Sequence, residues 1–218
     1  MKILILGATG RTGIQLVEEG LRRGHKINAL VRTPEKLRLE SPELKVITGT
    51  PINLDDLKEA MKGVEVVFSA LNISMSSELP WAKLTGPKDF ISNSIRNVIK
   101  VMREEGVKRI IVMSTAGAGD SVTEFPRWFR WLTKYSSMKY AYKEHGEQET
   151  LLKQSDLDWT AIRPMSLSNS QRAKEVMVSF SGVPKPKRSI SRRNVAKFML
   201  DIAENNEYIG QTPTISEK

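Results

Sequence analysis

Apolar runs alternate with longer amphipathic segments along nearly the whole chain, and this alternation limits the fold more than any other feature. The runs are short and rich in β-branched residues, which is typical of strands, whereas the longer segments repeat apolar residues at helical spacing. Strands that are joined through helices run parallel, because the crossover helix returns the chain to the same end of the sheet. The sequence therefore predicts an α/β fold.

Strands are predicted at residues 2–7, 26–32, 44–49, 64–71, 109–115 and 158–164. Helices are predicted between them, at 11–23, 53–61, 87–105 and 143–154. Strands this apolar are buried on both faces, so helices should cover both sides of the sheet. The chain has 218 residues without an internal repeat or low-complexity segment. We predict one domain, residues 1–218, with a doubly wound, Rossmann-like parallel sheet.

The composition excludes several classes of protein. Without cysteine the chain has neither a disulfide scaffold nor thiolate chemistry, which favours a reducing compartment. The opening apolar run ends at Gly7, which is too early for a secretory signal, and no run approaches the roughly 20 apolar residues of a membrane span. We expect a cytoplasmic protein with no membrane partner, and no metal site is predicted.

The formal net charge of +9 raises the question of nucleic-acid binding. Most basic residues are mixed with acids along helical segments such as "VMREEGVKR", so no nucleic-acid partner is predicted. The exception lies between Ser170 and Leu200, where eight Lys and Arg residues accompany the single acid Glu175. This segment is either a solvated basic face or an anion-attracting rim near a site.

The stretch "ILGATGRTG", residues 5–13, follows the first predicted strand and opens the first predicted helix. Gly7 would allow the tight turn, Gly10 the approach of a pyrophosphate to the backbone, and Gly13 close packing of the helix on the sheet. The helix N-terminus would present free N–H groups to phosphate. An ordinary glycine-rich turn is the alternative, but the position in a βα unit favours dinucleotide binding. The loop residues predicted to share that contact are Thr9, Arg11 and Thr12.

The end of the second strand bears on the choice of cofactor. A carboxylate there would bind the ribose 2′-hydroxyl of NAD, whereas arginine would pair with the 2′-phosphate of NADP. The sequence reads "NALVRTPEKL", with Arg32 and Thr33 at that end and no acid, and Arg11 can approach from the glycine loop. NADP(H) is the predicted cofactor; the alternative is that Arg32 is a surface arginine before a proline turn.

These segments carry a family resemblance. The stretches "GATGRTG", "LVRTPEKL", "GVEVVFSAL", "GVKRIIVMSTAG", "LDWTAIRP" and "SRRNVAKFML" resemble the atypical short-chain dehydrogenase/reductase superfamily, in the family's order and over nearly the whole chain. Within that superfamily, the chain resembles the small flavin reductase and biliverdin reductase B type proteins. The resemblance implies a dinucleotide-binding Rossmann fold, with further cofactor contacts from Thr50, Ala70, Leu71 and Pro164.

Where the family is catalytic, the resemblance implies a hydroxyl at the end of the fifth strand and a Tyr-x-x-x-Lys motif on the next helix. Ser114 and Thr115 match the hydroxyl position, and Thr115 is the better match. Aligning the helix on Glu149 puts His145 at the family's lysine and Ala141 at its tyrosine, so the usual pair is absent. A literal Tyr-x-x-x-Lys, residues 135–139, lies too early, and we interpret it as coincidence.

The missing tyrosine and lysine favour hydride transfer to an acceptor that needs little proton help, such as a flavin-, quinone- or tetrapyrrole-like ring. The predicted function is therefore an NADPH-dependent reductase of a planar small molecule. Two alternatives stay open: a non-catalytic NADP(H)-sensing regulator, and a nucleotide-sugar epimerase or isomerase, which would need a well-placed tyrosine. Tyr140 and Tyr142 are expected to be packing residues, and His145 is either a proton donor or, as we expect, an exposed helix residue.

Substrate contacts are predicted in the loops near 72–87, 116–137 and 164–190, at the carboxyl ends of the strands. Trp81, Trp128 and Met165 are the predicted contacts, because aromatic and methionine side chains can form a slot for a planar ring. The helical spacing in "FPRWFRWL" equally suits a lid, a short helix packed on its own domain, or a dimer contact. The chain is predicted to be a monomer or a homodimer.

Overall fold

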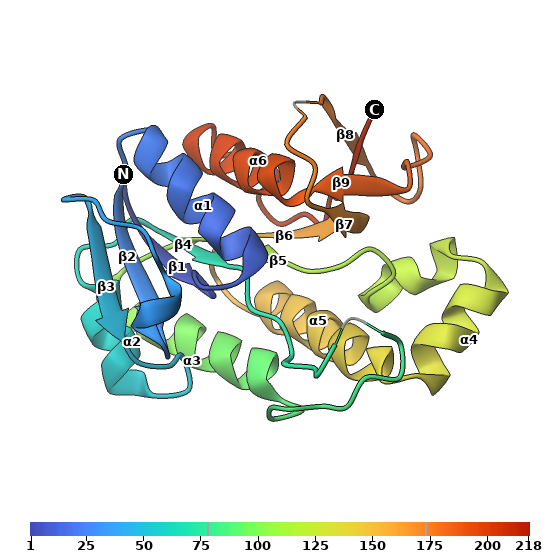
Figure 1. The fold of residues 1–218 in the computed structure, drawn as a ribbon, viewed down its shortest axis with the longest axis horizontal. Coiled ribbons are helices and arrows are strands. Elements are labelled where there is room, and N and C mark those ends of the chain that lie inside the picture. The colour runs from blue at the N-terminus through green and yellow to red at the C-terminus, as the bar shows by residue number, and fades with distance from the viewer. Residues whose placement is uncertain (78, 173) are drawn as a thin grey trace.

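The structure is a computed structural model that describes residues 1–77, 79–172 and 174–218. Residues 78 and 173, within two of the predicted substrate-side loops, lie outside the described residues. The main sheet has eight strands in the order β3-β2-β1-β4-β5-β6-β10-β8 (Figure 1). Its strands are β1 (Lys2–Leu6), β2 (Lys26–Val31), β3 (Leu44–Thr48), β4 (Val66–Ser69), β5 (Arg109–Met113), β6 (Asp158–Pro164), β8 (Val176–Ser179) and β10 (Thr214–Glu217).

All pairings in the main sheet are parallel except that of β8 with β10. The six predicted strands are all present, and the predicted fold class is confirmed. The helices are α1 (Arg11–Arg22), α2 (Leu54–Met61), α3 (Phe90–Glu105), α4 (Arg127–Tyr135), α5 (Met138–Lys153) and α6 (Arg192–Glu204), with short 3-10 helices η1 (Pro34–Lys36) and η2 (Gly119–Glu124). A small parallel pair joins β7 (Ser166–Ser168) to β9 (Ser189–Ser191).

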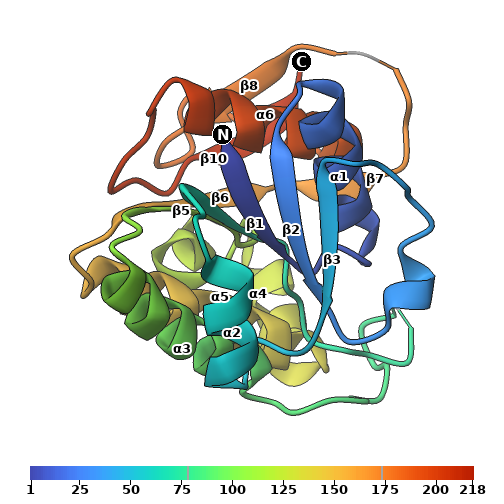
Figure 2. The same ribbon diagram turned by 90° about the vertical axis from the view of Figure 1, so that its left-hand side faces the viewer.

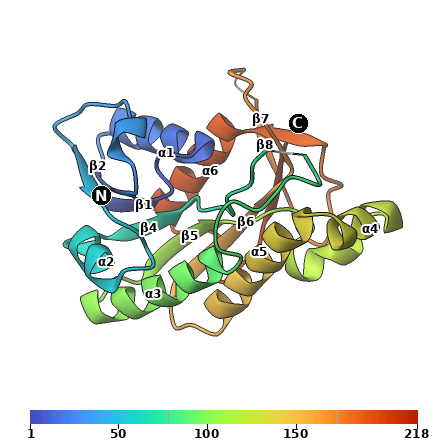
Figure 3. The ribbon, with the colours of Figure 1, turned by 60° about the horizontal axis from the view of Figure 1, so that its bottom comes forward.

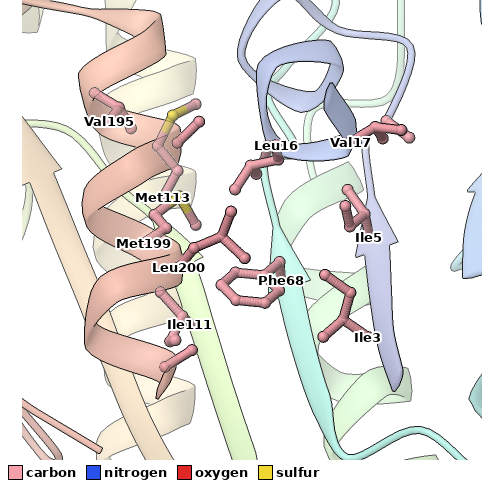
Figure 4. Packing of buried hydrophobic residues seen from close by; sticks show 14 of the residues in the cluster. Ile3, Ile5, Leu16, Val17, Phe68, Ile111, Met113, Val195, Met199 and Leu200 are labelled. Carbon is pink, nitrogen blue, oxygen red and sulfur yellow. The ribbon is translucent and has the colours of Figure 1, made fainter. Parts of the chain in front are cut away.

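Helices cover both faces of the sheet, as the apolar strands require. Helices α1 and α6 lie on one face, and α2, α3 and α5 lie on the other (Figures 1 and 2). On the α1 and α6 side, Phe68 of β4 packs among Leu16, Leu200 and Ile3 (Figure 4). Trp159 of β6 is buried in the cluster on the opposite face. Among the described helices, none is long and apolar enough to cross a lipid bilayer.

Several elements differ from the sequence prediction. Helix α5 begins at Met138, five residues before the predicted start at Lys143, and α3 begins at Phe90 and not at Pro87. Helix α6 and strand β10 follow the last predicted strand and were not among the predicted elements. Strand β10 has the sequence "TISE", which is polar and short, and the main sheet buries it only because it pairs with β6 and β8.

The strand order positions the site. The chain leaves β1 toward β2 and β3 on one side, and then crosses to β4, β5 and β6 on the other. Loops after β1 and β4 therefore leave the sheet in opposite directions and open a crevice between them, which is where doubly wound sheets bind ligands. Beyond the carboxyl end of β5, α4 projects past the body of the sheet beside α5 (Figure 3).

Candidate active site

A cavity of about 690 Å³ lies at the carboxyl ends of β1, β4, β5 and β6. It joins the glycine loop to the loops that follow the other three strands. Its lining includes Gly10, Arg11, Thr12, Ala70, Met75, Ser114, Thr115, Phe125, Phe129, Ala141, Tyr142, His145, Pro164, Met165 and Arg192. No three His, Asp or Glu side chains in the described part of the chain are grouped so that they could hold a metal ion.

The glycine loop has the geometry that a close backbone turn requires. Gly7 has φ +81°, and a Cβ there would lie 2.8 Å from the carbonyl oxygen of Ala70. A Cβ on Gly13 would collide with the carbonyl oxygen of Gly7. The predicted roles of Gly7 in the turn and of Gly13 in close packing are therefore confirmed.

The start of α1 fits the pyrophosphate of a dinucleotide. Its N-cap is Gly10, which has no side chain to satisfy the first-turn N–H groups, and Gly10, Arg11 and Thr12 all line the cavity. Uncapped N–H groups at a helix start attract anions, and a Cβ-free residue leaves room for one to approach. Thr9 is half-buried in the same loop but does not line the cavity.

A second arginine lies on this wall of the cavity. Arg192 is the first residue of α6, which packs along α1, and Nη1 of Arg192 donates to Oδ1 of Asn169 at 2.7 Å. Burial, and then the charge of nearby Arg11, lower the pKa of Arg192. The basic segment thus divides: Arg192 lies at the cavity, whereas Lys185, Lys187 and Arg188 are exposed. The segment therefore contains both a solvent-exposed basic group and an arginine at the cavity.

Arg32 and Thr33, predicted to choose the cofactor, lie outside the lining of the cavity, as does the predicted cofactor contact Thr50, whereas Arg11 lines it. Arg32 directly follows β2 and is exposed, with its guanidinium carbon 5.4 Å from the ring centroid of Phe90. Thr33 occupies the N-cap position of η1, and the backbone N–H of Thr50 donates to Asp56 at 2.9 Å. These residues stay predicted contacts for the adenosine half of the cofactor.

The remaining predicted cofactor contacts separate into two groups. Ala70 and Pro164 line the cavity, at the ends of β4 and β6. Leu71 is buried in the apolar cluster on the α2, α3 and α5 face and does not line the cavity. The substrate contacts separate too: Met165 lines the cavity, whereas Trp81 and Trp128 are 68% and 67% exposed and do not.

Phe125, Phe129 and Met75 supply the apolar lining that was expected of the tryptophans. Helix α4 turns Phe129 inward, where its ring meets Tyr142 at 6.0 Å between centroids. Trp128, one residue earlier, consequently points to solvent and meets Phe129 edge-on. Phe129 is part of the aromatic stretch seen in the sequence, but helical spacing alone does not say which face of α4 is turned inward.

Thr115 and Tyr142 form a hydroxyl pair in the cavity wall. Burial raises the pKa of Tyr142, and the nearby Thr115 hydroxyl offsets part of that increase. Both hydroxyls line the cavity, and each can donate a hydrogen bond to a ligand. Tyr142, expected to be a packing residue, therefore belongs to the site.

Ser114 lines the cavity as well, but its hydroxyl donates to Oε1 of Glu149 at 2.6 Å. Arg163 donates to the same buried carboxylate through Nε at 3.0 Å and Nη2 at 2.6 Å. The Ser114 proton is thus used inside the protein. Of the two predicted catalytic hydroxyls, Thr115 is therefore the one that can donate a hydrogen bond to a ligand in the cavity.

The expectation that His145 is exposed is wrong. The residue is only 3% exposed and lines the cavity together with Ala141, one helical turn before it. Because α5 already begins at Met138, Ala141 and His145 lie one turn apart on the same side of a regular helix, and both line the cavity. Burial lowers the pKa of His145 to about 4, so the ring is neutral at pH 7.

The literal Tyr-x-x-x-Lys is divided between two helices. Tyr135 ends α4 and is 60% exposed, while Lys139 lies in the first turn of α5. The two side chains do not share a helix face as in the family's motif, which agrees with the interpretation that this match to the motif is a coincidence. Tyr140 is not part of the cavity lining, and Nζ of Lys139 lies 5.2 Å from its ring centroid.

Comparisons with known proteins agree with this geometry. A family model described as NAD(P)H-binding matches residues 7–206. The chain is 24% identical to a 3-beta-hydroxysteroid dehydrogenase of Mycolicibacterium neoaurum, over 69% of this chain and 45% of that protein. It is 20% identical to reductase pytE of Aspergillus terreus, over 98% of this chain and 97% of that protein. The chain thus spans less than half of the first relative and nearly all of the second.

Two solved structures share the fold. ChuY, an anaerobillin reductase from Escherichia coli O157:H7, is 19% identical, with a TM-score of 0.79 over 100% of this chain and 97% of that one. A short-chain dehydrogenase/reductase from Veillonella parvula, solved in complex with NADP, is 20% identical, with a TM-score of 0.80 over 99% and 94%. They confirm the resemblance in fold to short-chain dehydrogenases/reductases. Because the family model covers most of the chain, this protein belongs to the NAD(P)H-binding family.

Proposed function

We propose that this protein is an NADPH-dependent oxidoreductase that transfers a hydride to a planar flavin-, quinone- or tetrapyrrole-like acceptor. One observation carries the proposal: a single cavity joins the uncapped start of α1 to the Thr115–Tyr142 pair and to an apolar lining of Phe125 and Phe129. An anion site, hydrogen-bond donors and aromatic rings in one space suit a dinucleotide beside a flat conjugated ring. A protein of similar fold is named an anaerobillin reductase, which agrees with this class of acceptor.

We assign the preference for NADPH over NADH to the end of β2. Arg32 follows that strand directly, where an acid would select NADH, and stacking on Phe90 holds its side chain near the strand end. A guanidinium at this position can pair with a 2′-phosphate. The preference rests on this residue and on the family match, which covers both dinucleotides.

Bound NADPH would supply the hydride from its nicotinamide ring. The protein's own contribution is then mainly placement. The start of α1, with Gly10 and Arg11, would hold the pyrophosphate, and the Thr115–Tyr142 pair would orient the reacting rings by hydrogen bonding. Phe125, Phe129 and Met165 would stack against the acceptor and exclude water. Water at the cavity mouth would supply the proton that completes the reduction.

A non-catalytic NADPH sensor is the second candidate, because the helix lacks the family's lysine: Gly146 stands four residues after Tyr142. An epimerase or isomerase is less favoured. It would need Tyr142 as an acid and base, and burial holds the pKa of that phenol above its ordinary value without a lysine to lower it.

Steady-state oxidation of NADPH and NADH with riboflavin, FMN, a soluble quinone and biliverdin tests the proposal. We expect turnover with at least one acceptor and a higher kcat/KM for NADPH than for NADH. Binding of NADPH without turnover of any acceptor would favour the sensor. Conversion of a nucleotide sugar without net NADPH oxidation would favour the epimerase.

A further inference from the structure

The amide of Gln148 fixes the state of the His145 ring. Gln148 is buried, and its Nε2 donates to the carbonyl oxygen of Met113 at 3.0 Å. The same nitrogen lies 2.8 Å from Nδ1 of His145. A carbonyl oxygen only accepts hydrogen bonds, so the amide nitrogen must face it, and the second N–H of that nitrogen is directed at the ring. Nδ1 of His145 is therefore an acceptor and carries no proton.

A neutral imidazole whose Nδ1 is bare carries its proton on Nε2. Within the described residues, no group other than Gln148 is hydrogen-bonded to the His145 ring. Because the side chain lines the cavity and Nδ1 is turned to Gln148, Nε2–H is the polar atom left for a ligand. The ring presents a donor of fixed direction to the cavity, which Thr115 also lines.

Burial keeps the ring neutral, and the carboxylates nearest to it along α5 are paired with other groups. Glu149, one turn further along α5, accepts from Ser114 and Arg163, and Glu144 accepts from the backbone and hydroxyl of Ser92. Neither carboxylate is hydrogen-bonded to the imidazole. The charged side chains that line the same cavity are Arg11 and Arg192, and both are cationic, which disfavours a third positive charge.

We infer that His145, at the position of the family's lysine, is a catalytic hydrogen-bond donor that performs the donating role of the family's tyrosine, with Gln148 as the positioning residue that sets its tautomer. This inference rests on the proposed function. It also narrows the acceptor, which needs a carbonyl oxygen or an unprotonated ring nitrogen conjugated to the atom that receives the hydride.

The chemistry balances without an acid on the protein. The hydride adds with its electron pair to one end of the acceptor's conjugated system, and the displaced π electrons move onto the oxygen or nitrogen at the other end. The Nε2–H of His145 stabilises that negative charge by hydrogen bonding and keeps its proton, since a neutral imidazole is a very weak acid. Water then protonates the reduced acceptor. Donors aimed at developing charge are among the largest contributions to catalysis.

Two substitutions of similar size separate donation from packing. His145→Leu fills the space without a donor, whereas His145→Gln can return an amide N–H near the position of Nε2. We expect kcat to fall on the order of 100-fold in His145→Leu and about 10-fold or less in His145→Gln, with the KM for NADPH unchanged. Equal activities of the two variants would overturn the inference.

Gln148→Glu should move the proton of the neutral His145 ring from Nε2 to Nδ1 without replacing the histidine. A carboxylate accepts from Nδ1, so the neutral ring of this variant would carry its proton on Nδ1 and offer a bare Nε2 to the acceptor. Only the imidazolium form would still donate from Nε2. We expect the kcat of this variant to fall as the pH rises through the pKa of its histidine, while the wild-type kcat stays level between about pH 6 and 8. Identical pH profiles would contradict the positioning role.

Nitrogen NMR reads the tautomer without any turnover. The chain has two histidines, His25 and His145, so the His25→Gln variant leaves one ring to observe in protein labelled with ¹⁵N-histidine. We expect a protonated Nε2 and a bare Nδ1 at pH 7. A proton on Nδ1 in an active enzyme would overturn the donor role alone. An enzyme that binds NADPH and reduces none of the acceptors would overturn the proposed function and the donor role together.

Discussion

The hydroxyl of Thr115 lies close enough to the phenol of Tyr142 to lower its pKa against the effect of burial, at the cavity wall where the end of β5 meets the first turns of α5. Gly117 makes this contact sterically possible. It has φ +91°, and a Cβ there would lie 3.2 Å from the rings of both Phe129 and Tyr142. The loop after β5 and the first turns of α5 thus bring a small hydroxyl and an aromatic one to the same wall of the cavity.

The two hydroxyls should contribute unequally. Thr115→Ala removes the hydroxyl at the family's catalytic position and leaves the buried phenol of Tyr142 without its partner, so we expect kcat/KM to fall about 10- to 100-fold. Tyr142→Phe leaves Thr115 free to donate and should cost less, about as little as Tyr135→Phe and Tyr140→Phe. Steady-state kinetics with the best acceptor measure all four. A loss of about 1,000-fold in Tyr142→Phe with NADPH affinity unchanged would instead make Tyr142 the general acid.

Exchange of one charge should reverse the cofactor preference. Arg32→Glu removes the partner of the 2′-phosphate and adds repulsion, so NADPH affinity should fall about 100-fold, while NADH affinity holds or improves. The matched control is Lys26→Glu, the same change of charge at the exposed start of the same strand. Calorimetric titration with both dinucleotides checks this. Equal losses for NADPH and NADH would mean that Arg32 does not contact the 2′-phosphate.

Local sequence signals identified the parts of the site that depend on local backbone geometry. Gly7 and Gly13 could be predicted because their spacing behind an apolar strand leaves few conformations, whereas Thr115 was predicted from the resemblance of its segment to the family. His145 could not be placed in this way. Its burial depends on where α5 begins and on Gln148 reaching Met113, and neither is visible in the residues around it.

Local sequence patterns also failed for Arg192, which lines the cavity without having been predicted, and for Trp128, which was predicted and does not line it. Arg192 reaches the cavity because α6 packs along α1, a contact between segments about 180 residues apart, which no local pattern records. Trp128 was a reasonable substrate contact by residue type, but the rotation of α4 turns its neighbour Phe129 inward. Strand β10 was missed because its burial comes from its neighbours in the sheet and not from its own composition.

The buried pair of Glu149 and Arg163 should be a main support of the cavity floor. Both side chains are almost wholly buried, and Glu149 also accepts from Ser114. Glu149→Gln would leave the buried charge of Arg163 with the largely exposed Asp120 as its remaining charged partner, at a cost of about 3 kcal/mol in the free energy of unfolding. Glu147→Gln, on the same helix, breaks a pair with Arg96 that is partly exposed and should cost less than about 1 kcal/mol. Urea unfolding followed by tryptophan fluorescence compares them, and similar costs would contradict the assignment.

The buried neutral ring of His145 should make the fold sensitive to mild acid. Its pKa is about 4 in the folded protein because of burial, against an ordinary value near 6.5 in the unfolded chain. Between these two values the unfolded chain binds the proton and the folded protein does not, so the free energy of unfolding rises with pH. The stability is therefore complete above about pH 6.5 and is lost as the pH falls toward 4. From pH 7.5 to pH 5 we expect a loss of about 2 kcal/mol in wild type that His145→Gln does not show. Urea unfolding of both proteins at the two pH values measures the difference, which also cancels the carboxylates that the two proteins share. Equal losses would mean that the ring titrates alike in the folded and unfolded chains, and that the cavity is open enough to hydrate it.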